Sequence, residues 1–163
     1  MRAIKRAMTD ILDYEPRHQS DFERLNVEWL ERYFVVEPID QKVLADPETH
    51  ILSEGGHILM AEDDGDVVGT VALKRQGPRS IELTKMAVTS DSQGRGIGRL
   101  LLEAAIRRFA ELEADHLYLE SHSSLDTALH LYERAGFRHE SPPAPSEYAR
   151  ADVYMVYHPP DSH

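Results

Sequence analysis

The sequence predicts an α/β fold in which one mixed, mostly antiparallel sheet of six or seven strands is flanked by helices. Three observations indicate this class. The 163 residues fit one domain. Hydrophobic residues make up 41% of the chain, which is enough for a core. Strand-like and helix-like segments follow the order β-α-α-β-β-β-α-β-α-β-β. We expect the domain at residues 10–160, after a short leader at residues 1–9.

The N-terminal third predicts one strand and two helices. Ile11–Tyr14 has the length and composition of a short strand. The region from Pro16 to Phe34 has helical spacing. The apolar positions that recur there every three or four residues are Phe22, Leu25, Trp29 and Tyr33. Pro38 ends that helix, and Asp40 is expected to cap a short one that runs towards Asp46-Pro47.

Three strand-like segments come next, at His57–Glu62, Val67–Lys74 and Ser80–Val88. The composition of Asp63–Asp66 predicts a tight hairpin turn between the first two, and Gln76-Gly77-Pro78 predicts the next turn. In the third strand, simple alternation predicts one face with Ile81, Leu83 and Lys85 and the other with Glu82, Thr84 and Met86.

A long helix is predicted over Gly96–Glu113, opened by the glycines at 94–98. Its inner face is a repeat at near four-residue spacing, formed by Ile97, Leu101, Ala105, Phe109 and Leu112. A short strand follows at His116–Glu120. We expect it to be the parallel neighbour of Ser80–Val88, because parallel neighbours need a crossover and this helix is the only segment long enough there.

The C-terminal part predicts a helix and two strands. Asp126–Arg134 has helical spacing, and Gly136 is expected to end the helix as a C′ glycine. A strand begins at Phe137–Glu140, the prolines between positions 142 and 145 predict a stiff loop, and Asp152–Tyr157 is the last strand.

Composition and charge exclude several classes of function. The formal charge of −11 opposes binding to a phosphate backbone, so no nucleic-acid partner is expected. An acidic surface is compatible with a cationic substrate such as an amine, although net charge is mainly informative about solubility. No apolar run approaches the roughly 20 residues that span a membrane. The leader, whose basic residues are Arg2, Lys5 and Arg6, lacks the apolar stretch of a secretory signal. These patterns predict a soluble, cytoplasmic protein.

The residue types available also narrow the chemistry. The chain has no cysteine, which removes disulfides, thiolate metal sites and a cysteine nucleophile. Its nine histidines show no metal-ligand spacing, so no metal is expected. Ser121, His122, Ser123 and Asp126 suggest a catalytic triad, but adjacent residues rarely converge and no G-x-S-x-G elbow is present.

The clearest functional signal is QGRGIG at Gln93–Gly98, between a strand and a helix. Glycines let the backbone approach a ligand, and the unpaired N–H groups of the first helical turn favour an anion. Arg95 and Arg99 add positive charge, so a pyrophosphate suits this turn. Alone, the pattern is equally typical of a turn that only starts a helix. A dinucleotide fingerprint fails because Arg99 stands where the third glycine is needed, and no Lys-Ser or Lys-Thr completes a P-loop.

The remaining pattern, Q-x-x-G-x-G, resembles that of the GNAT superfamily of acyl-CoA N-acyltransferases, which carries [QR]-x-x-G-x-[GA] at this strand-to-helix junction. The strand IELTKMAV precedes it, and ALHLYERAGF follows. The second segment is similar to the family signature A-x-x-L-Y-x-x-x-G-F at Ala128, Leu131, Tyr132, Gly136 and Phe137. Together the matches cover about residues 81–137. The resemblance implies that the parallel strands splay apart to admit acetyl-CoA.

The resemblance also implies roles by position. The backbone of the strand end holds the acetyl carbonyl and the pantetheine arm, and the amides of the turn hold the pyrophosphate. The cofactor-binding residues implied in this way are Met86, Ala87, Val88, Gln93, Gly94, Arg95, Gly96, Ile97, Gly98, Arg99 and His122. Many members have an asparagine where this chain has Leu125, and His122 is expected to fill part of that space.

Two residues are candidates for catalysis. The resemblance places the hydroxyl of Tyr132 near the departing sulfur, and Glu82 matches a strand position that supplies a general base in some members. A core aromatic and a solvated strand residue are the respective alternatives. Acyl transfer needs a deprotonated amine and a protonated leaving thiolate, so a base and an acid are both useful at pH 7. Residues that could line an acceptor pocket, with ordinary packing as the alternative, are Tyr33, Phe34, Glu37, Tyr148 and Arg150.

The function expected from the sequence is therefore acetyl-CoA-dependent N-acetylation, by direct attack, of a primary amine of a small molecule or peptide. One alternative is a non-catalytic module of the same fold that senses acyl-CoA or binds a partner. A nucleotide-binding protein that uses the glycine turn is a third class. The acceptor stays open, and so does the oligomeric state, with a homodimer among the options.

Overall fold

The computed structural model describes residues 9–160 and contains one seven-stranded sheet. The strands are β1 (Thr9–Asp13), β2 (His57–Asp63), β3 (Asp66–Arg75), β4 (Ser80–Val88), β5 (His116–Ser121), β6 (Phe137–His139) and β7 (Val153–Tyr157). The helices are α1 (Gln19–Tyr33), α2 (Pro38–Ala45), α3 (Ile97–Ala110) and α4 (Asp126–Ala135). The predicted fold class is confirmed. Of the predicted leader, residues 1–8 lie outside the described residues, and Thr9 begins β1.

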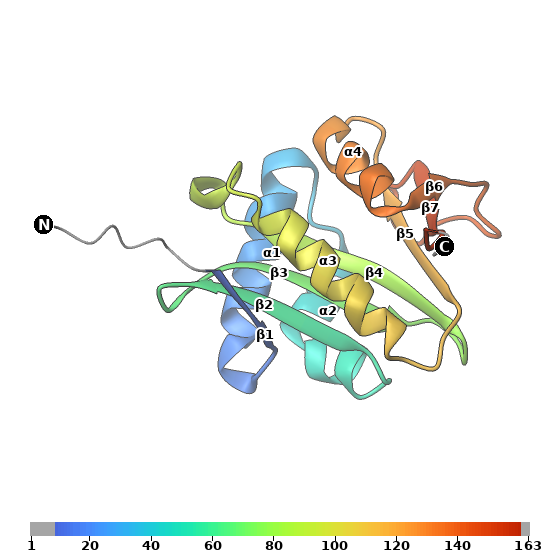
Figure 1. Cartoon of the computed structure of the whole chain (residues 1–163). Coiled ribbons are helices and arrows are strands. Elements are labelled where there is room, and N and C mark those ends of the chain that lie inside the picture. Colours follow the sequence, from blue (N-terminus) through green and yellow to red (C-terminus); the bar gives the residue numbers. More distant parts are fainter. Residues whose placement is uncertain (1–8, 161–163) are drawn as a thin grey trace, which may run out of the picture.

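The strand order is β1-β2-β3-β4-β5-β7-β6, and every neighbouring pair is antiparallel except β4 and β5. The prediction of a parallel pair joined by the long helix is thus confirmed. In Figure 1 the α3 helix lies over the part of the sheet formed by β1 to β4, and β5, α4, β6 and β7 form one end of the molecule.

Two apolar cores lie on opposite faces of the sheet. On one face, α3 and α4 pack against the strands through residues that include Leu101, Phe109 and Leu129. The predicted inner face of α3 is confirmed up to Phe109, and Leu112 lies beyond the end of the helix. On the other face, α1 and α2 pack through Phe22 and other apolar residues. Each fully buried Leu or Phe stabilises the fold by about 1.5–3 kcal/mol.

The turns follow local residue chemistry. Asp64 (φ 51°) and Gly65 (φ 86°) both adopt positive φ between β2 and β3, as a type I′ hairpin requires. Gly136 ends α4 with φ 115°, so the predicted C′ glycine is confirmed. The α2 helix differs from prediction. Its N-cap is Glu37, and Asp40, the expected cap, lies at the third helical position and accepts a hydrogen bond from the Glu37 N–H.

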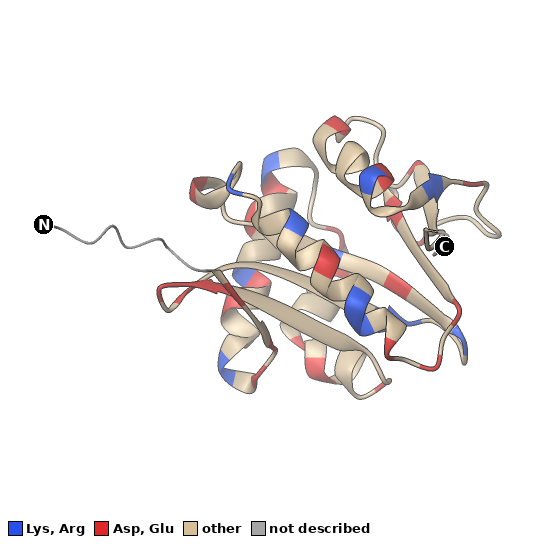
Figure 2. Cartoon of the chain, in the orientation of Figure 1, with Lys and Arg blue, Asp and Glu red and all other residues tan. Residues whose placement is uncertain are grey.

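Acidic residues occur on most elements, including the β2–β3 hairpin and the turn before β5, rather than on one face (Figure 2). Within residues 9–160, none of the helices combines the length and the apolar character needed to cross a membrane.

Candidate active site

The central feature of the site is the separation of β4 and β5. The two strands pair at Ser80 with His116, Ile81 with Leu117 and Glu82 with Tyr118, and the pairing then ends. Both strands continue, β4 as far as Val88. The edge of β4 that faces β5 therefore has backbone groups beyond Glu82 that do not pair with a strand, although the Val88 carbonyl accepts a hydrogen bond from Gln93 Nε2 at 3.3 Å.

A β-bulge in β4 reorients the strand at this point. Thr70 and Ala72 of β3 are opposite Ala87 and Thr84, so two steps along β3 match three along β4. Lys85 has φ 55°, a left-handed conformation that is uncommon outside glycine. The predicted alternation, which put Lys85 on the face of Ile81 and Leu83, is wrong here. The extra residue turns its side chain to the other face, where Nζ donates to Asp40 Oδ1 of α2 at 2.9 Å.

The glycine turn before α3 offers a run of free donors. Gly94 (φ 85°) and Gly96 (φ 80°) both adopt left-handed conformations that residues with a Cβ rarely take. The first helical hydrogen bond is from Leu100 N–H to the Gly96 carbonyl. Among the described residues, no hydrogen bond uses a backbone N–H from Gly94 to Arg99. The helix macrodipole adds to the attraction of these groups for an anion.

These donors face a groove of about 800 Å³ that runs between β4, α3 and α4. Most of the residues predicted to bind the cofactor line it, namely Met86, Ala87, Val88, Gln93, Gly94, Gly96, Ile97, Gly98 and Arg99. The structure therefore brings nine of the residues named from the sequence together on one continuous surface.

Arg95 and His122 do not line this groove. The Arg95 guanidinium forms an ion pair with Asp63 Oδ2 at 2.8 Å, at the end of β2. His122 lies beside a second, smaller cavity, where its Nδ1 accepts a hydrogen bond from the Ser124 N–H at 3.0 Å and its ring packs edge-on against Phe34. The suggested triad does not form. Within residues 9–160, no hydrogen bond joins His122 to Ser121, Ser123 or Asp126; its ring instead contacts Ser124 Oγ at 2.7 Å, and Ser123 Oγ donates to Asp152.

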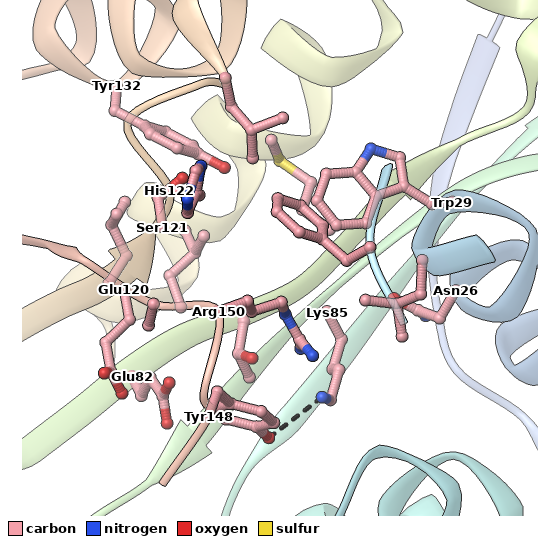
Figure 3. Close-up of a pocket in the computed structure, with 18 residues that line it drawn as sticks. Asn26, Trp29, Glu82, Lys85, Glu120, Ser121, His122, Tyr132, Tyr148 and Arg150 are labelled. Carbon is pink, nitrogen blue, oxygen red and sulfur yellow. Dashed lines mark hydrogen bonds between the residues drawn. The ribbon is translucent and has the colours of Figure 1, made fainter. Parts of the chain in front are cut away.

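The second cavity has a volume of about 100 Å³ (Figure 3) and adjoins the groove. Three residues line both: Trp29 of α1, Met86 of β4 and Leu125, the N-cap of α4. Leu125 occupies the position where the resemblance led us to expect an asparagine, so this boundary is apolar. The cavity is placed at the point where β4 and β5 separate.

Tyr132 reaches the cavity from α4, and its hydroxyl is directed into it (Figure 3). The side chain is only 9% exposed, and the hydroxyl has no hydrogen-bond partner within residues 9–160. Burial raises the pKa of Tyr132 to about 12, so the phenol keeps its proton at neutral pH. A protonated, unpartnered hydroxyl is available to donate a hydrogen bond or a proton to a ligand.

Glu82 lines the cavity from β4 and is 6% exposed. Its Oε1 accepts a hydrogen bond from Gln76 Nε2 at 2.9 Å. Burial raises the pKa of Glu82 above its ordinary value of 4.5, and the charge of Glu120 raises it further, although the bond from Gln76 opposes the shift. A carboxylate in this environment is a better proton acceptor than one in water.

Of the residues predicted for an acceptor pocket, three line the small cavity, one lines the groove and one lines neither. Phe34, Tyr148 and Arg150 line the small cavity, and Tyr33 lines the groove. Glu37 lines neither, because its carboxylate is used to hold the β6–β7 loop. It accepts hydrogen bonds from the Ala149 N–H at 3.1 Å and from Arg150 Nη1 at 3.0 Å.

An ion network behind the cavity was not predicted from the sequence. Arg150 donates to both carboxylate oxygens of Asp40, at 2.8 and 2.9 Å, and Lys85 donates to the same carboxylate. Burial alone would raise the pKa of Asp40, but the bonds from Arg150 and the charge of Lys85 lower it to about 2. Burial also lowers the pKa of Lys85. The partners are far apart in sequence, and the only local signal was an acidic residue in the first turn of a helix.

No group of three His, Asp or Glu side chains within residues 9–160 is arranged to hold a metal ion. The site thus consists of a groove with backbone donors and a cavity with a buried acid and a buried carboxylate.

Comparison with known proteins is consistent with this geometry. The family model described as the acetyltransferase (GNAT) family matches residues 14–137. The uncharacterized N-acetyltransferase YvbK of Bacillus subtilis is 30% identical over 102 residues, which are 61% of this chain and 66%, just under two thirds, of that protein.

Solved structures with the same fold include an acetyltransferase of the GNAT family from Staphylococcus aureus. It has a TM-score of 0.82 and 22% identity, and the match covers 92% of this chain and 98% of that one. The yncA protein of Salmonella typhimurium, solved with its cofactor acetyl-CoA, has a TM-score of 0.74 and 18% identity, with 96% of each chain covered.

Proposed function

The chain belongs to the GNAT family of acetyltransferases, and on that premise we propose that it transfers the acetyl group of acetyl-CoA to a primary amine by direct attack. One observation carries the proposal. The groove with free N–H groups from Gly94 to Arg99 joins, at Met86, a cavity into which the unpartnered hydroxyl of Tyr132 is directed.

The groove suits the parts of acetyl-CoA in order. Its free N–H groups at the start of α3 would bind the pyrophosphate. The open edge of β4, at Met86 and Val88, would pair with the amides of the pantetheine arm, as a strand pairs with a neighbour. This arrangement brings the thioester to the boundary with the cavity. The yncA protein binds a cofactor of the same kind, which supports the choice of ligand.

The cavity supplies the acid and the base. The neutral amine attacks the carbonyl carbon of the thioester, and a C–N bond forms as the carbon becomes tetrahedral. Collapse of this intermediate breaks the C–S bond, and the sulfur takes a proton from the Tyr132 hydroxyl. Glu82 accepts the proton that the ammonium must lose, directly or through a water molecule. The nitrogen is positively charged after the attack and loses its second proton to water as the amide forms. Glu82 returns its proton to solvent, and the phenolate regains one from solvent before the next cycle.

Release of free thiol from acetyl-CoA tests the proposal. A panel of amines should give amine-dependent release above a control without amine, and mass spectrometry should find the acetylated product. The non-catalytic alternative would give thermal stabilisation by CoA without this release. Stabilisation by ATP or NAD but not by CoA would point instead to a nucleotide-binding protein. Ligand at a hundredfold excess over Kd should stabilise the fold by about 2.7 kcal/mol.

A further inference from the structure

The charges that line the small cavity are unequally matched. Four side chains with fixed charge line it, Lys85 and Arg150 with positive charge and Glu82 and Glu120 with negative charge. The cations have anionic partners outside the cavity, but among residues 9–160 neither carboxylate has a cation within ion-pair distance. This difference indicates which charge a ligand should carry.

The two cations form ion pairs with carboxylates that lie outside the cavity. Lys85 and Arg150 both bind the Asp40 carboxylate, which is fully buried, and Arg150 also binds Glu37. Asp40 and Glu37 do not line the cavity. Two cations and two anions therefore leave no net charge, and the terminal nitrogens of Arg150 already donate to carboxylates. An anionic group on a ligand would find no unmatched cation here.

The two carboxylates lie close together without a direct cationic partner, although the charges of Lys85 and Lys74 act on Glu82 from a greater distance. Glu82 and Glu120 are neighbours in Figure 3, and the charge of Glu120 raises the pKa of Glu82 in addition to the effect of burial. Within residues 9–160, neither forms an ion pair within 4.0 Å. Glu82 has only the neutral amide of Gln76 as a partner. A cation between them would relieve the repulsion, and the buried Tyr132 hydroxyl, directed into the same cavity, is a second polar group that a ligand there could contact.

The size of the cavity limits the shape of that cation. Its volume is about 100 Å³. A cavity of about 150 Å³ holds a benzene ring, so this smaller volume favours a narrow group over a ring next to the amine. An ammonium group on an unbranched alkyl chain is narrow enough.

We propose that the acceptor is an unbranched primary alkylamine with no carboxylate on the amine-bearing carbon, and that its ammonium group binds between Glu82 and Glu120. This inference rests on the proposed acetyl transfer. It makes Glu120 a substrate-binding residue and disfavours the α-amine of free amino acids. Both a small amine and a lysine side chain have the required chemistry.

The first test compares acceptors of the wild-type protein at a saturating concentration of acetyl-CoA. Butylamine, norvaline amide and norvaline differ only at the amine-bearing carbon, which carries hydrogen, a neutral amide or a carboxylate. We expect kcat/KM for butylamine to exceed that for norvaline by at least about tenfold, because like charges in a buried site repel. The amide should fall between them, and cyclohexylamine should be poor. The α-amine of norvaline loses its proton more easily, so basicity works against this expectation.

A lysine blocked at its α-amine and its carboxyl tests whether the acceptor can be a lysine side chain of a protein or only a small amine. If the blocked lysine is acetylated, the class of acceptors includes protein side chains. If butylamine is acetylated and the blocked lysine is not, the class is restricted to small amines. Turnover of norvaline equal to or above that of butylamine would overturn the inference while leaving acetyl transfer in place. Absence of thiol release with every amine would instead contradict the proposed function.

The second test is Glu120→Gln, with Glu113→Gln as the control. Glu113 is exposed in the turn before β5 and lines neither cavity, so its substitution makes the same charge change elsewhere. Glu120→Gln should raise KM for butylamine roughly tenfold with little change in kcat, and should reduce the preference for butylamine over norvaline. An unchanged Kd for acetyl-CoA would show that the variant is folded. With that Kd retained, an unchanged KM and preference would overturn the assignment.

Discussion

The cofactor groove and the acceptor cavity adjoin at Met86 but are built in different ways. The polar surface of the groove is mostly backbone, from the N–H groups after Gly94 and the open edge of β4. The polar surface of the cavity consists of side chains from α1, α4, β4, β5 and the β6–β7 loop. Its ion network joins residues that are 45 and 110 positions apart in the chain.

This difference separates affinity for the cofactor from catalysis. A backbone surface depends on local conformation, so changes to the turn should alter the Kd of acetyl-CoA and the stability of the turn but not the acceptor KM. A surface of buried side chains depends on matched charges and hydrogen bonds, so changes there should alter the rate, the acceptor KM or stability.

The largest effect is expected for Tyr132→Phe, because it removes the proposed acid. We expect kcat to fall by roughly 10²–10⁴-fold, while the Kd of acetyl-CoA barely changes. Steady-state kinetics and calorimetric binding measure the two quantities. Tyr157→Phe, which removes a hydroxyl on β7 that lines neither cavity, is the matched control. An unaltered kcat would make Tyr132 a packing residue and would contradict the proposal that the cavity supplies the catalytic acid.

Asp40→Asn should have the next largest effect, on stability. Removing this charge leaves Lys85 and Arg150 without their shared partner, and breaking a buried pair costs roughly 3–5 kcal/mol. Denaturant unfolding measures the loss, and Asp10→Asn, at an exposed position, should be nearly neutral. A loss no larger than that of the control would contradict a structural role for the network.

The same carboxyl predicts a dependence of stability on pH. Its pKa is about 2 in the folded protein, compared with an ordinary value of 3.8 that applies to the unfolded chain, so the folded state favours the ionised form. This contribution is present above pH 3.8 and is lost as the pH falls through about 2. In Asp40→Asn, stability should fall less steeply over this range.

Glu82→Gln should lower kcat/KM by roughly 10²-fold at pH 7, because it removes the proposed base. The pKa of Glu82 is raised by burial, and Glu120, Lys85 and Lys74 are the charged groups that act on it. The wild-type kcat/KM should therefore rise with pH through a value above 4.5. The variant should lack that rise but recover activity at high pH, as the free amine accumulates towards its pKa near 10.4.

A pH profile of kcat/KM for both proteins gives the result, and Glu113→Gln controls for the loss of one charge. A variant with the wild-type profile would assign the base to water or to His122. The cavity would then bind the acceptor without deprotonating it.

Gly96→Ala should have the smallest effect, confined to the groove. Gly96 and Gly65 have similar positive φ, 80° and 86°, and an added Cβ would meet nothing within 4 Å at either position. Both substitutions should cost about 1–2 kcal/mol of stability. Only Gly96→Ala should also weaken acetyl-CoA binding, by roughly tenfold, with the acceptor KM unchanged. An equal change of Kd in Gly65→Ala would show that general strain, not the turn, is responsible.

The sequence was sufficient for the features that depend on local chemistry. The repeat from Ile97 to Phe109 and the residues before it predicted the crossover helix, and hence the parallel pairing of β4 and β5. Gly94 and Gly96 predicted the turn, because positive φ is favourable where no Cβ is present. Since the donors of the turn are consecutive backbone groups, predicting the turn also predicted the free N–H groups on one side of the groove.

Only the tertiary structure decided the rest. The bulge at Lys85 depends on how β3 pairs with β4, which no pattern within β4 reports, and it sends the lysine to the opposite face from that expected. Asp40 lies in the first turn of a short helix, and only the packing of α2 beside β4 and the β6–β7 loop makes it the partner of two cations. Arg95 pairs with Asp63 because the β2–β3 hairpin lies beside the turn. A buried charge is stable only beside its partner, and that partner is known only once the chain has folded.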